Sequence, residues 1–530
     1  EALITATPGD PLAVEAWRMR STLAETVPLN AGDRVQLLGL LLNNPTSDAE
    51  AELREMEHAP DLSAGRRVDA SLALARFQYR RKRYDQALAH TRALTGTAGA
   101  GAEARLIEAR IHRNAGRLQL METTYRSLMN PRSGQGVTAA WELAKEWESR
   151  SEWQKAAKVY SELLSKFPAS PRERDATFRR GFTRVMQGKK KEALSDFRNA
   201  YRLSRTPNEK EQAAFWSSRT LWTLGRRRDA VIVARRAAQA DEPADAYGVL
   251  LRERFGVPAP TRPSPEDIAD QGAAFEAMCW SCDAVRAVLP PELRATYRTG
   301  LSRLDLGLKS AVRRDWRRAV ATHKPGARDL QLFALTASAY DLYPEATQWA
   351  KQAMTGPWLS DPERIALRRV TYPAAHGGLV LIEASRNGLD PAWVWALMRQ
   401  ESFYDPEAVS HKGAMGLMQI MPATLTRLTT ENDMGSLPPE VLFRPNTNIA
   451  FGTRFFADRL SEFGGHLFPT LAGYNAGEAK SREWIERSKG DTQEIFLECI
   501  GYPETYDYVR RIVWNTWLYH HLYSEGNGIG

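Results

Sequence analysis

A glutamate near the end of an apolar helical segment is the residue of this chain best suited to acid–base chemistry. Residues 389–402 predict one helix, because Asp390 can cap the N-terminus and Pro391 is favoured in the first turn. Glu401 follows Leu397 by four residues, so its carboxyl group should lie on or beside the buried face. Burial disfavours the charged form of a carboxyl group and raises its pKa, which preserves the proton that a general acid needs near neutral pH.

The segment after this helix has a composition that suits the wall of a binding site. Gly413 and Gly416 permit tight backbone turns, and Gln419 carries both hydrogen-bond donors and acceptors. The thioethers of Met418 and Met421 add adaptable apolar surface. Taken by itself, however, a methionine-rich run at this spacing favours a packed core over a site.

The elements that must position these residues are predicted to be helices. Apolar residues recur at helical spacing across most of residues 10–355, and the alternation typical of strands is almost absent. The predicted fold class is therefore all-α. Within it a helix–turn–helix unit recurs with spacings of 34, 35, 37 and 37 residues between equivalent positions, which are Tyr84, Leu118, Trp153, Lys190 and Arg227.

A repeat of this length resembles a tetratricopeptide-like, α-superhelical solenoid. Glycine precedes several of the second helices, at Gly116, Gly188 and Gly225, where it would form the turn of a hairpin. Each hairpin would bury its apolar side against the next. Because solenoids present extended concave surfaces, the repeat fits a binding scaffold and plain structural support equally well.

Two interruptions divide the chain into three predicted domains. Residues 256–265 contain four prolines and cannot form an uninterrupted helix. A second break at 372–378 precedes a segment that is denser in Trp, Tyr, Met and Gly, a composition that suits a domain with a pocket. We therefore predict an α-superhelical solenoid domain over residues 1–290, a helical linker domain over 291–371 and a catalytic domain over 372–530.

Charge and cysteine content narrow the classes of partner and cofactor. The formal net charge of +8 favours an anionic partner such as an acidic glycan, a nucleic acid or a membrane surface. No nucleic-acid-binding module is recognisable, and no apolar run approaches the roughly 20 residues of a membrane span. Cys279 and Cys282 form a CxxC pair without further ligands nearby, which predicts packed thiols or a local disulfide instead of a zinc site. We expect no metal and no cofactor.

Three motifs in a fixed order resemble the soluble lytic transglycosylase family. They are Gln-Glu-Ser-Phe at 400–403, Gly-Ala-Met-Gly-Leu-Met-Gln-Ile-Met-Pro-Ala-Thr at 413–424, and Leu-Ala-Gly-Tyr-Asn-Ala-Gly at 471–477. The segments 448–452 and 498–509 are similar to further elements of that family. The resemblance implies a goose-type lysozyme-like catalytic domain. It also implies cleavage of peptidoglycan between N-acetylmuramic acid and N-acetylglucosamine, which leaves 1,6-anhydromuramic ends.

The same resemblance assigns roles to individual residues. Glu401 would be the catalytic acid and base, and Tyr474 would hydrogen-bond near its carboxyl group. The acid of the last motif is either Glu498 or Glu504, and Tyr506 stands where the family usually has Arg, which would alter contacts to the peptide stem. The residues implied to bind or shape the substrate site are Ser410, Gln419, Met421, Tyr474, Asn475, Ala476 and Glu498.

The resemblance also implies a location and partners. The protein would act in the periplasm after removal of a signal peptide, and its substrate would be the glycan strands of peptidoglycan. Other cell-wall enzymes are candidate partners, and nucleic acid is not expected. A basic solenoid suits this substrate, because the peptide stems of peptidoglycan carry carboxylates.

Two other interpretations stay open on the sequence alone. Most glycosidases use two carboxylates about 5 to 9.5 Å apart, and no obvious second one accompanies Glu401 in its segment. Asp405 is followed by Pro406, which favours a capping or turn role. A second carboxylate that faced Glu401 across the cleft would favour a lysozyme-like hydrolase. The chain could also be a repeat scaffold for cell-wall proteins that carries a vestigial domain.

Overall fold

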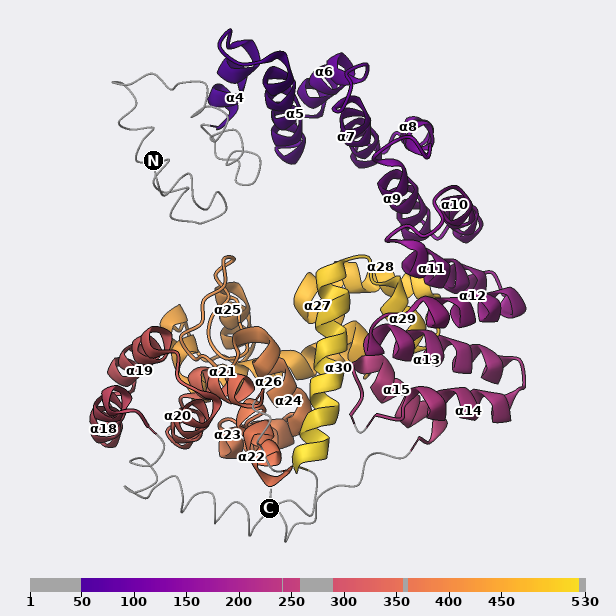
Figure 1. The fold of residues 1–530 in the computed structure, drawn as a ribbon. Coiled ribbons are helices and arrows are strands. Elements are labelled where there is room, and N and C mark those ends of the chain that lie inside the picture. Colours follow the sequence, from indigo (N-terminus) through magenta and orange to yellow (C-terminus); the bar gives the residue numbers. More distant parts are fainter. Residues whose placement is uncertain (1–48, 241, 258–288, 356–360, 524–530) are drawn as a thin grey trace. The chain divides into compact units, whose positions relative to one another are not determined.

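The computed structural model describes residues 49–240, 242–257, 289–355 and 361–523 (Figure 1). Within these ranges the regular structure is helical, apart from isolated β-bridges, so the predicted all-α fold class is confirmed. None of the helices described is both long and apolar enough to cross a membrane. The chain divides into a first compact unit that ends at Arg205 and a second that begins at Thr206. The predicted CxxC pair, Cys279 and Cys282, lies outside the described residues.

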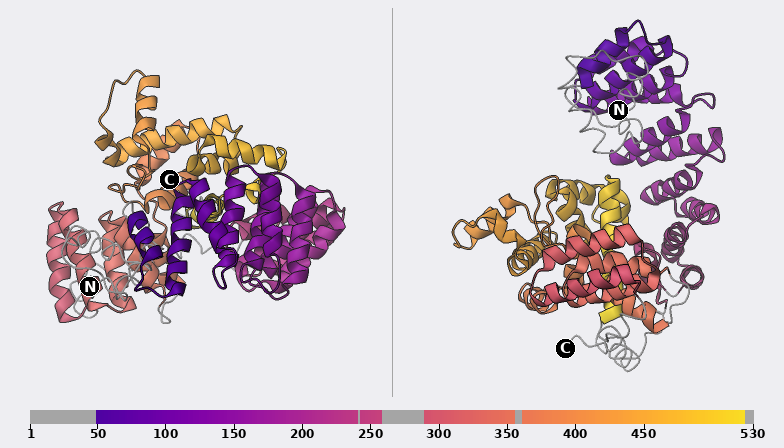
Figure 2. Two further views of the ribbon diagram at one scale, coloured as in Figure 1. Left: turned by 90° about the horizontal axis from the view of Figure 1, so that it is seen from above. Right: turned by 60° about the vertical axis from the view of Figure 1, so that its left-hand side comes forward.

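The first unit is a row of helical hairpins. After α4 (Ala49–His58) come four hairpins, formed by α5 (Ala64–Arg80) and α6 (Tyr84–Leu94), α7 (Gly101–Asn114) and α8 (Leu118–Leu128), α9 (Gly136–Ser149) and α10 (Trp153–Lys166), and α11 (Glu173–Met186) and α12 (Lys190–Leu203). Each hairpin packs on the next through contacts of α6 with α7, α8 with α9 and α10 with α11 (Figures 1 and 2). This is the stacked arrangement that the repeat predicts.

The second helices of the hairpins begin where the sequence repeat places them. Helices α6, α8, α10, α12 and α14 (Arg227–Ala237) start at the predicted equivalent positions, which are Tyr84, Leu118, Trp153, Lys190 and Arg227. The pattern continues beyond the predicted repeats, because Lys309 and Tyr343 begin two further second helices 34 residues apart. The proline-rich interruption breaks the period before these two hairpins, which is why the sequence repeat did not reveal them.

A shared turn closes the seven hairpins of this kind among the described residues. One residue takes a left-handed φ, and the next N–H donates to the carbonyl five residues earlier, as the Lys189 N–H does to Arg184 O at 2.9 Å. This Schellman-type bond satisfies a carbonyl that the end of a helix leaves without an intrahelical partner. The left-handed residues are Lys82, Gly116, Ser151, Gly188, Gly225, Gly307 and Asp341.

The second unit combines three such hairpins with less regular helices around the long C-terminal helix α30 (Pro503–Tyr523). The hairpins are α13 (Pro207–Thr223) with α14, α18 (Pro291–Asp305) with α19 (Lys309–His323), and α20 (Ala327–Ala339) with α21 (Tyr343–Ala353). The other elements are α15 (Ala246–Phe255), α22 (Asp361–Thr371), α23 (Gly377–Arg386), α24 (Pro391–Ser402), α25 (Pro422–Glu431), the 3₁₀ helix η1 (Pro439–Phe443), α26 (Pro445–Glu462), α27 (Leu467–Ala476), α28 (Glu478–Ser488) and α29 (Gln493–Cys499).

Helix α30 lies at the centre of this unit. It packs against α24, α27 and α15 (Figure 1). Polar contacts add to this packing, because Arg510 of α30 forms an ion pair with Asp245, and Trp514 Nε1 donates to the carbonyl of Pro243 at 2.7 Å. Helix α30 therefore connects the helices that carry the chemical motifs with α13 and α15.

Aromatic side chains form the core of the hairpins α18–α19 and α20–α21. Trp316 stacks on Tyr297 with 5.4 Å between ring centroids, and the edge-to-face contact of Trp316 with Phe333 has a centroid distance of 5.2 Å. Gly300 permits this packing, because a Cβ there would lie 2.1 Å from the indole nitrogen of Trp316. These three rings are buried, so the hairpins have a firm core of their own.

The shared turn can be tested with two matched substitutions in the first unit. Gly188→Ala should cost about 1 kcal/mol, because a residue with a Cβ is disfavoured at its φ of +75°. Nothing lies within 4 Å of the added Cβ, so the cost is confined to the backbone. Ser151 has the equivalent φ of +59°, so Ser151→Gly should not destabilise the unit. Denaturant midpoints would measure both changes, and a destabilised Ser151→Gly variant would contradict the interpretation.

Candidate active site

Glu401 lies in the last turn of α24, which begins as the sequence predicts. The Asp390 carboxylate accepts a hydrogen bond from the Ala392 N–H at 2.8 Å, and Pro391 is the first helical residue. Val394 and Leu397 are fully buried on the face that leads to Glu401. The helix ends immediately afterwards, because Phe403 takes a left-handed φ of +56°. The carboxyl group of Glu401 is thereby held at the end of a buried helix.

Burial controls the acidity of Glu401. It raises the pKa of this carboxyl group from 4.5 to about 7, against the opposing effect of a hydrogen bond from Tyr508. The Tyr508 hydroxyl, on α30, donates this bond to Glu401 Oε1 at 2.5 Å. A carboxyl group with a pKa near 7 is present in both protonation states at neutral pH, as a group that acts first as an acid and then as a base requires.

A cavity of about 410 Å³ opens beside Glu401. Its walls come from the end of α24, the end of α27 and the first turns of α30. The lining residues are Gln400, Glu401, Asn475, Glu504, Asp507, Tyr508 and Arg511. The structure therefore brings Glu401 together with one predicted substrate residue, Asn475, and with Glu504, one of the two acids that the sequence left open.

Tyr508 was not among the residues singled out from the sequence. The family resemblance instead predicts that Tyr474 hydrogen-bonds near the catalytic carboxyl group. In the structure the Tyr474 hydroxyl donates to the carbonyl of Met418 at 2.7 Å, and Glu401 receives its hydrogen bond from Tyr508. Tyr474 is still close enough for the charge of Glu401 to add to the burial that raises its own pKa.

The end of α27 shapes the floor of the cavity. Asn475 accepts a hydrogen bond from the Thr505 hydroxyl at 2.6 Å, which joins α27 to the start of α30. Ala476 is half-buried and is the last residue of α27, before Gly477 with its φ of +89°. Asn475 lines the cavity and Ala476 does not, so their predicted place beneath the acid stays a prediction.

The wall predicted from the glycine- and methionine-rich segment is a compact loop. Ser410 Oγ accepts from the Ala414 N–H at 3.0 Å. The Gln419 amide donates to the carbonyls of Ala408 and Gly416 at 3.1 and 2.8 Å. These two side chains therefore hold the loop itself, while the side chain of Met421 stays 39% exposed.

Asn448, on α26, fixes this loop from behind. Its carboxamide oxygen accepts from the Met418 N–H at 2.8 Å, and its nitrogen donates to the carbonyls of Met415 and Leu442. The side chain is fully buried. Gly416 leaves room for this contact, because a Cβ there would lie 2.2 Å from the Asn448 amide nitrogen.

The structure does not bring Glu498 to the cavity. This residue is 3% exposed, and its carboxylate accepts from the hydroxyl of Tyr247 and from the amide of Gln212 at 3.0 Å. Tyr506, which replaces the usual Arg of the family, also donates to Glu498, at 3.2 Å. Glu498 and Tyr506 thus join the C-terminal helices to α13 and α15. Glu504 is the acid of this motif that lines the cavity.

Carboxylates other than Glu401 are present in the cavity. Both Glu504 and Asp507 are exposed, and Asp507 lies 3.4 Å from Arg510. Asp405 has the turn role expected of it, since it accepts from the Glu407 N–H at 3.2 Å and pairs with Arg313 at 3.2 Å. Among the described residues, no group of three or more His, Cys, Asp or Glu side chains could hold a metal ion.

Comparisons with known proteins point to one family. Residues 378–497 match the family model described as transglycosylase SLT domain. The chain is 30% identical over 224 residues to the soluble lytic murein transglycosylase of Salmonella typhimurium and 31% identical over 212 residues to that of Escherichia coli K12. These matches cover 41% and 39% of this chain but only 32% and 30% of those relatives, so the matched segment spans about a third of their length.

A solved structure matches the fold over a longer stretch. It is the inactive glutamate-to-glutamine mutant of the lytic transglycosylase Slt from Pseudomonas aeruginosa, with a TM-score of 0.64 and 20% sequence identity. The match covers 98% of this chain and 76% of that chain. At this identity the likeness establishes the fold, and it extends well beyond the segment that carries the motifs.

Substitution of Glu498 and of Glu504 should show which of these two acids has a structural role and which belongs to the cavity. Glu498→Gln should destabilise the second unit by about 1 to 3 kcal/mol. The amide replaces one acceptor oxygen with an NH2 group, so a buried donor could lose its acceptor or face another donor. Glu504→Gln should change stability by less than about 0.5 kcal/mol, because Glu504 is exposed. Denaturant unfolding followed by tryptophan fluorescence measures both, and equal losses would contradict the assignment.

The raised pKa of Glu401 predicts a pH-dependent stability difference. In wild type the carboxyl group ionises near pH 4.5 when unfolded and near 7 when folded, so stability falls as the pH rises through this interval. Gln cannot ionise, so Glu401→Gln should be more stable than wild type above pH 7 and equal to it at low pH. Melting temperatures across this range, with Glu504→Gln as the control, measure the difference. A difference that did not change with pH would contradict the raised pKa.

Proposed function

We propose that this chain, which belongs to the soluble lytic transglycosylase family through its SLT domain, cleaves the glycan strands of peptidoglycan. The bond would be that between N-acetylmuramic acid and N-acetylglucosamine. The observation that carries the proposal is the buried carboxyl group of Glu401, whose pKa of about 7 suits a general acid, at the edge of a cavity.

The names of the relatives support the same activity. The Salmonella and Escherichia coli proteins are named soluble lytic murein transglycosylases, and the Pseudomonas protein is inactive when one glutamate becomes glutamine. That single change fits a reaction in which one carboxyl group is essential. Glu401 is the candidate for that role in this chain, because burial raises its pKa and it lines the cavity.

The proposed mechanism uses Glu401 twice. Its protonated form donates to the glycosidic oxygen, so the bond from this oxygen to C1 of the muramic acid breaks. The N-acetyl group of the same sugar stabilises the developing positive charge. The Glu401 carboxylate then takes the proton of the 6-hydroxyl group, whose oxygen bonds to C1. The product is a 1,6-anhydromuramic end, and no water is consumed.

Tyr508 positions and tunes Glu401 in this scheme. Its hydrogen bond fixes one carboxyl oxygen and lowers the pKa below the value that burial alone would give. An acid with its pKa close to the working pH loses and regains its proton with similar ease. Tyr508 therefore supports the second role of Glu401, as a base, without removing the first.

A hydrolytic reaction is the second candidate, because Glu504 and Asp507 line the same cavity. Either carboxylate could activate a water molecule if it faced the sugar from the side opposite Glu401, as in inverting glycosidases. Transfer to the 6-hydroxyl group is favoured here because both carboxylates are exposed, and Asp507 is close to Arg510. Exposed carboxylates stay hydrated by bulk water, whereas a site that excludes water strengthens the electrostatic interactions inside it.

The wider setting follows from the substrate. We place the protein in the periplasm, where peptidoglycan lies, and we propose that its net charge of +8 helps it to hold strands with acidic peptide stems. The hairpins before the catalytic motifs would provide the extended surface for this contact. Other cell-wall enzymes are candidate partners of the same surface.

The products distinguish transfer from hydrolysis. Wild type should release muropeptides that are one water lighter than hydrolytic products, and borohydride should leave their muramic ends unchanged, because an anhydro end cannot be reduced. Glu401→Gln should lower the rate by at least about 10²-fold, since it removes the general acid. Mass spectrometry of digested cell walls measures both.

Matched variants of the cavity identify a hydrolytic base if there is one. Glu504→Gln and Asp507→Asn should keep the anhydro product, with smaller losses of rate than Glu401→Gln. Reducible ends as the main product of wild type would overturn the transfer mechanism. In that case, a variant that no longer formed reducible ends would identify its substituted carboxylate as the base that activates water.

A further inference from the structure

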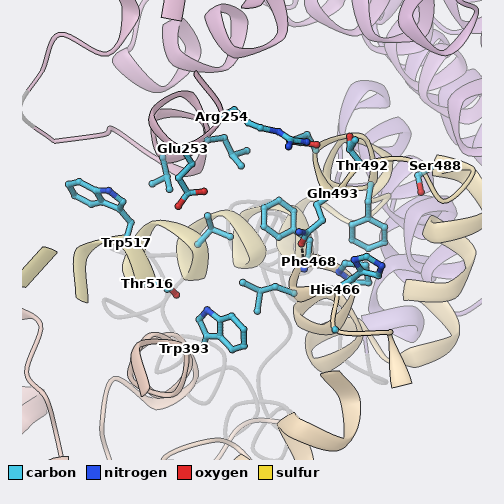
Figure 3. Close-up of a pocket in the computed structure, with 18 of the residues that line it drawn as sticks. Glu253, Arg254, Trp393, His466, Phe468, Ser488, Thr492, Gln493, Thr516 and Trp517 are labelled. Carbon is cyan, nitrogen blue, oxygen red and sulfur yellow. Dashed lines mark hydrogen bonds and ion pairs between the residues drawn. The ribbon is translucent and has the colours of Figure 1, made fainter. Parts of the chain in front are cut away.

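A second and larger cavity lies in the unit that contains Glu401, and it shares no lining residue with the first. Its volume is about 860 Å³. Figure 3 shows its walls, which come from α15, the start of α24, the segment between α26 and α27, the α28–α29 junction and the later turns of α30. Cavities of roughly 300 to 1,000 Å³ with few polar groups are typical of small-molecule sites.

The lining of this second cavity is largely apolar and aromatic. Leu250, Phe468 and Phe496 are buried and form part of its inner surface. The indoles of Trp393 and Trp517 are only half-buried. His521 stacks on one face of Trp517 with 5.1 Å between ring centroids, so this ring can offer a ligand its other face. An apolar or aromatic body would lose water-exposed surface by entering such a space, which favours binding.

Thr516 is an unsatisfied polar group in this apolar lining. The residue is 7% exposed, and its hydroxyl has no hydrogen-bond partner among the described residues. Threonines within helices commonly donate to the carbonyl four residues earlier, as Thr453 does to Ile449 O at 2.8 Å. A buried polar group left without a partner is costly, so the Thr516 hydroxyl is suited to bind a group that enters the cavity.

Glu253 gives the cavity a carboxylate without an ion-pair partner among the described residues. The three other carboxylates of the lining are paired, Asp390 with His520 at 2.7 Å, Glu494 with Arg254 at 2.8 Å and Asp491 with Arg219 at 3.8 Å. Burial raises the pKa of Glu253, although His520 of the same lining lowers it in part. In Figure 3 its carboxylate points from α15 into the space that Trp517, Thr516 and Trp393 border.

A carboxylate beside two indole rings is a recognisable chemical pattern. The faces of tryptophan rings attract cations, and this cation–π contact is stronger where water is excluded. A carboxylate strengthens the preference for positive charge, whereas it would repel an anion. Small apolar anions and neutral amphiphiles are therefore poorer matches for this cavity than an amphipathic cation of the same size.

We propose that this cavity binds a small amphipathic organic cation. The ammonium group would lie between Glu253 and the rings of Trp393 and Trp517. The apolar body would pack on Phe468 and Phe496. The site goes beyond the proposed cleavage of glycan strands, because none of its residues lines the Glu401 cavity.

Three probes of equal size and different charge test the proposal on the full chain. They are phenylbutylamine, phenylbutanol and phenylbutyrate, which are a cation, a neutral alcohol and an anion at pH 7. Isothermal titration calorimetry, together with the change in tryptophan fluorescence, should show one site for the amine and at least about 10-fold weaker binding of the other two. The assay measures no cleavage, so it is independent of the proposed enzymatic activity.

Matched variants assign the site to these residues. Glu253→Gln should weaken amine binding to the level of the alcohol and leave alcohol binding unchanged. The variant should fold, because the amide is nearly isosteric with the carboxyl group and Glu253 forms no ion pair with a described residue. Trp393→Leu should weaken all three probes. Glu504→Gln, in the other cavity, should leave amine binding as in wild type.

Three results would overturn the proposal. The first is an amine that shows no saturable binding, and the second is equal binding of the three probes. The third is amine binding that persists in Glu253→Gln but is lost in Glu401→Gln, which would place the amine in the cavity of Glu401. The expected pattern, with charge selectivity that depends on Glu253, would establish the second site.

Discussion

The desolvation of one carboxyl group is the constraint on which the rest of this structure depends. Glu401 can keep its proton near neutral pH only because burial raises its pKa to about 7. That burial requires α24 to end against α30, where Tyr508 meets the carboxyl group. A shift of α30 along its axis would replace this contact with water, and the pKa of Glu401 would fall back toward that of an ordinary surface glutamate. The position of α30 therefore determines the chemistry.

The position of α30 is in turn fixed by helices that precede the catalytic motifs. Arg510 pairs with Asp245 of the α15 N-cap, and Glu498 accepts hydrogen bonds from α13 and α15. These buried polar contacts are specific in register, because a displaced helix would leave charged groups unpaired. The compact unit that holds the site accordingly begins at Thr206. The catalytic domain predicted to begin at residue 372 stays a prediction, and by itself it would lack the partners of Glu498 and Arg510.

The sequence predicted those parts of the fold that depend on residues close together in the chain. The cap at Asp390, the starts of the second helices and the burial of Glu401 follow from caps, spacing and periodicity within a few turns. Tyr508 could not be selected in this way, because its role arises only when α30 packs on α24, more than 100 residues away in sequence. The same holds for Glu498, whose partners Gln212 and Tyr247 lie in other helices. The resemblance to a family pointed to the last motif but could not choose between Glu498 and Glu504, of which Glu504 lines the cavity.

The loop that follows α24 shows that residues of a chemical motif can also hold the backbone in place. Its backbone hydrogen bonds are those of turns and isolated bridges, such as that from the Gly416 N–H to the Ala408 carbonyl at 2.9 Å, so the remaining N–H and C=O groups need other partners. Ser410, Gln419 and Asn448 supply them, and this requirement alone explains polar residues at these positions. A loop already held in this way, with Met421 exposed on its surface, would need little further ordering to bind a ligand. The acidity of Glu401 and the conformation of this loop thus depend on different contacts, the first with α30 and the second in part with Asn448 of α26.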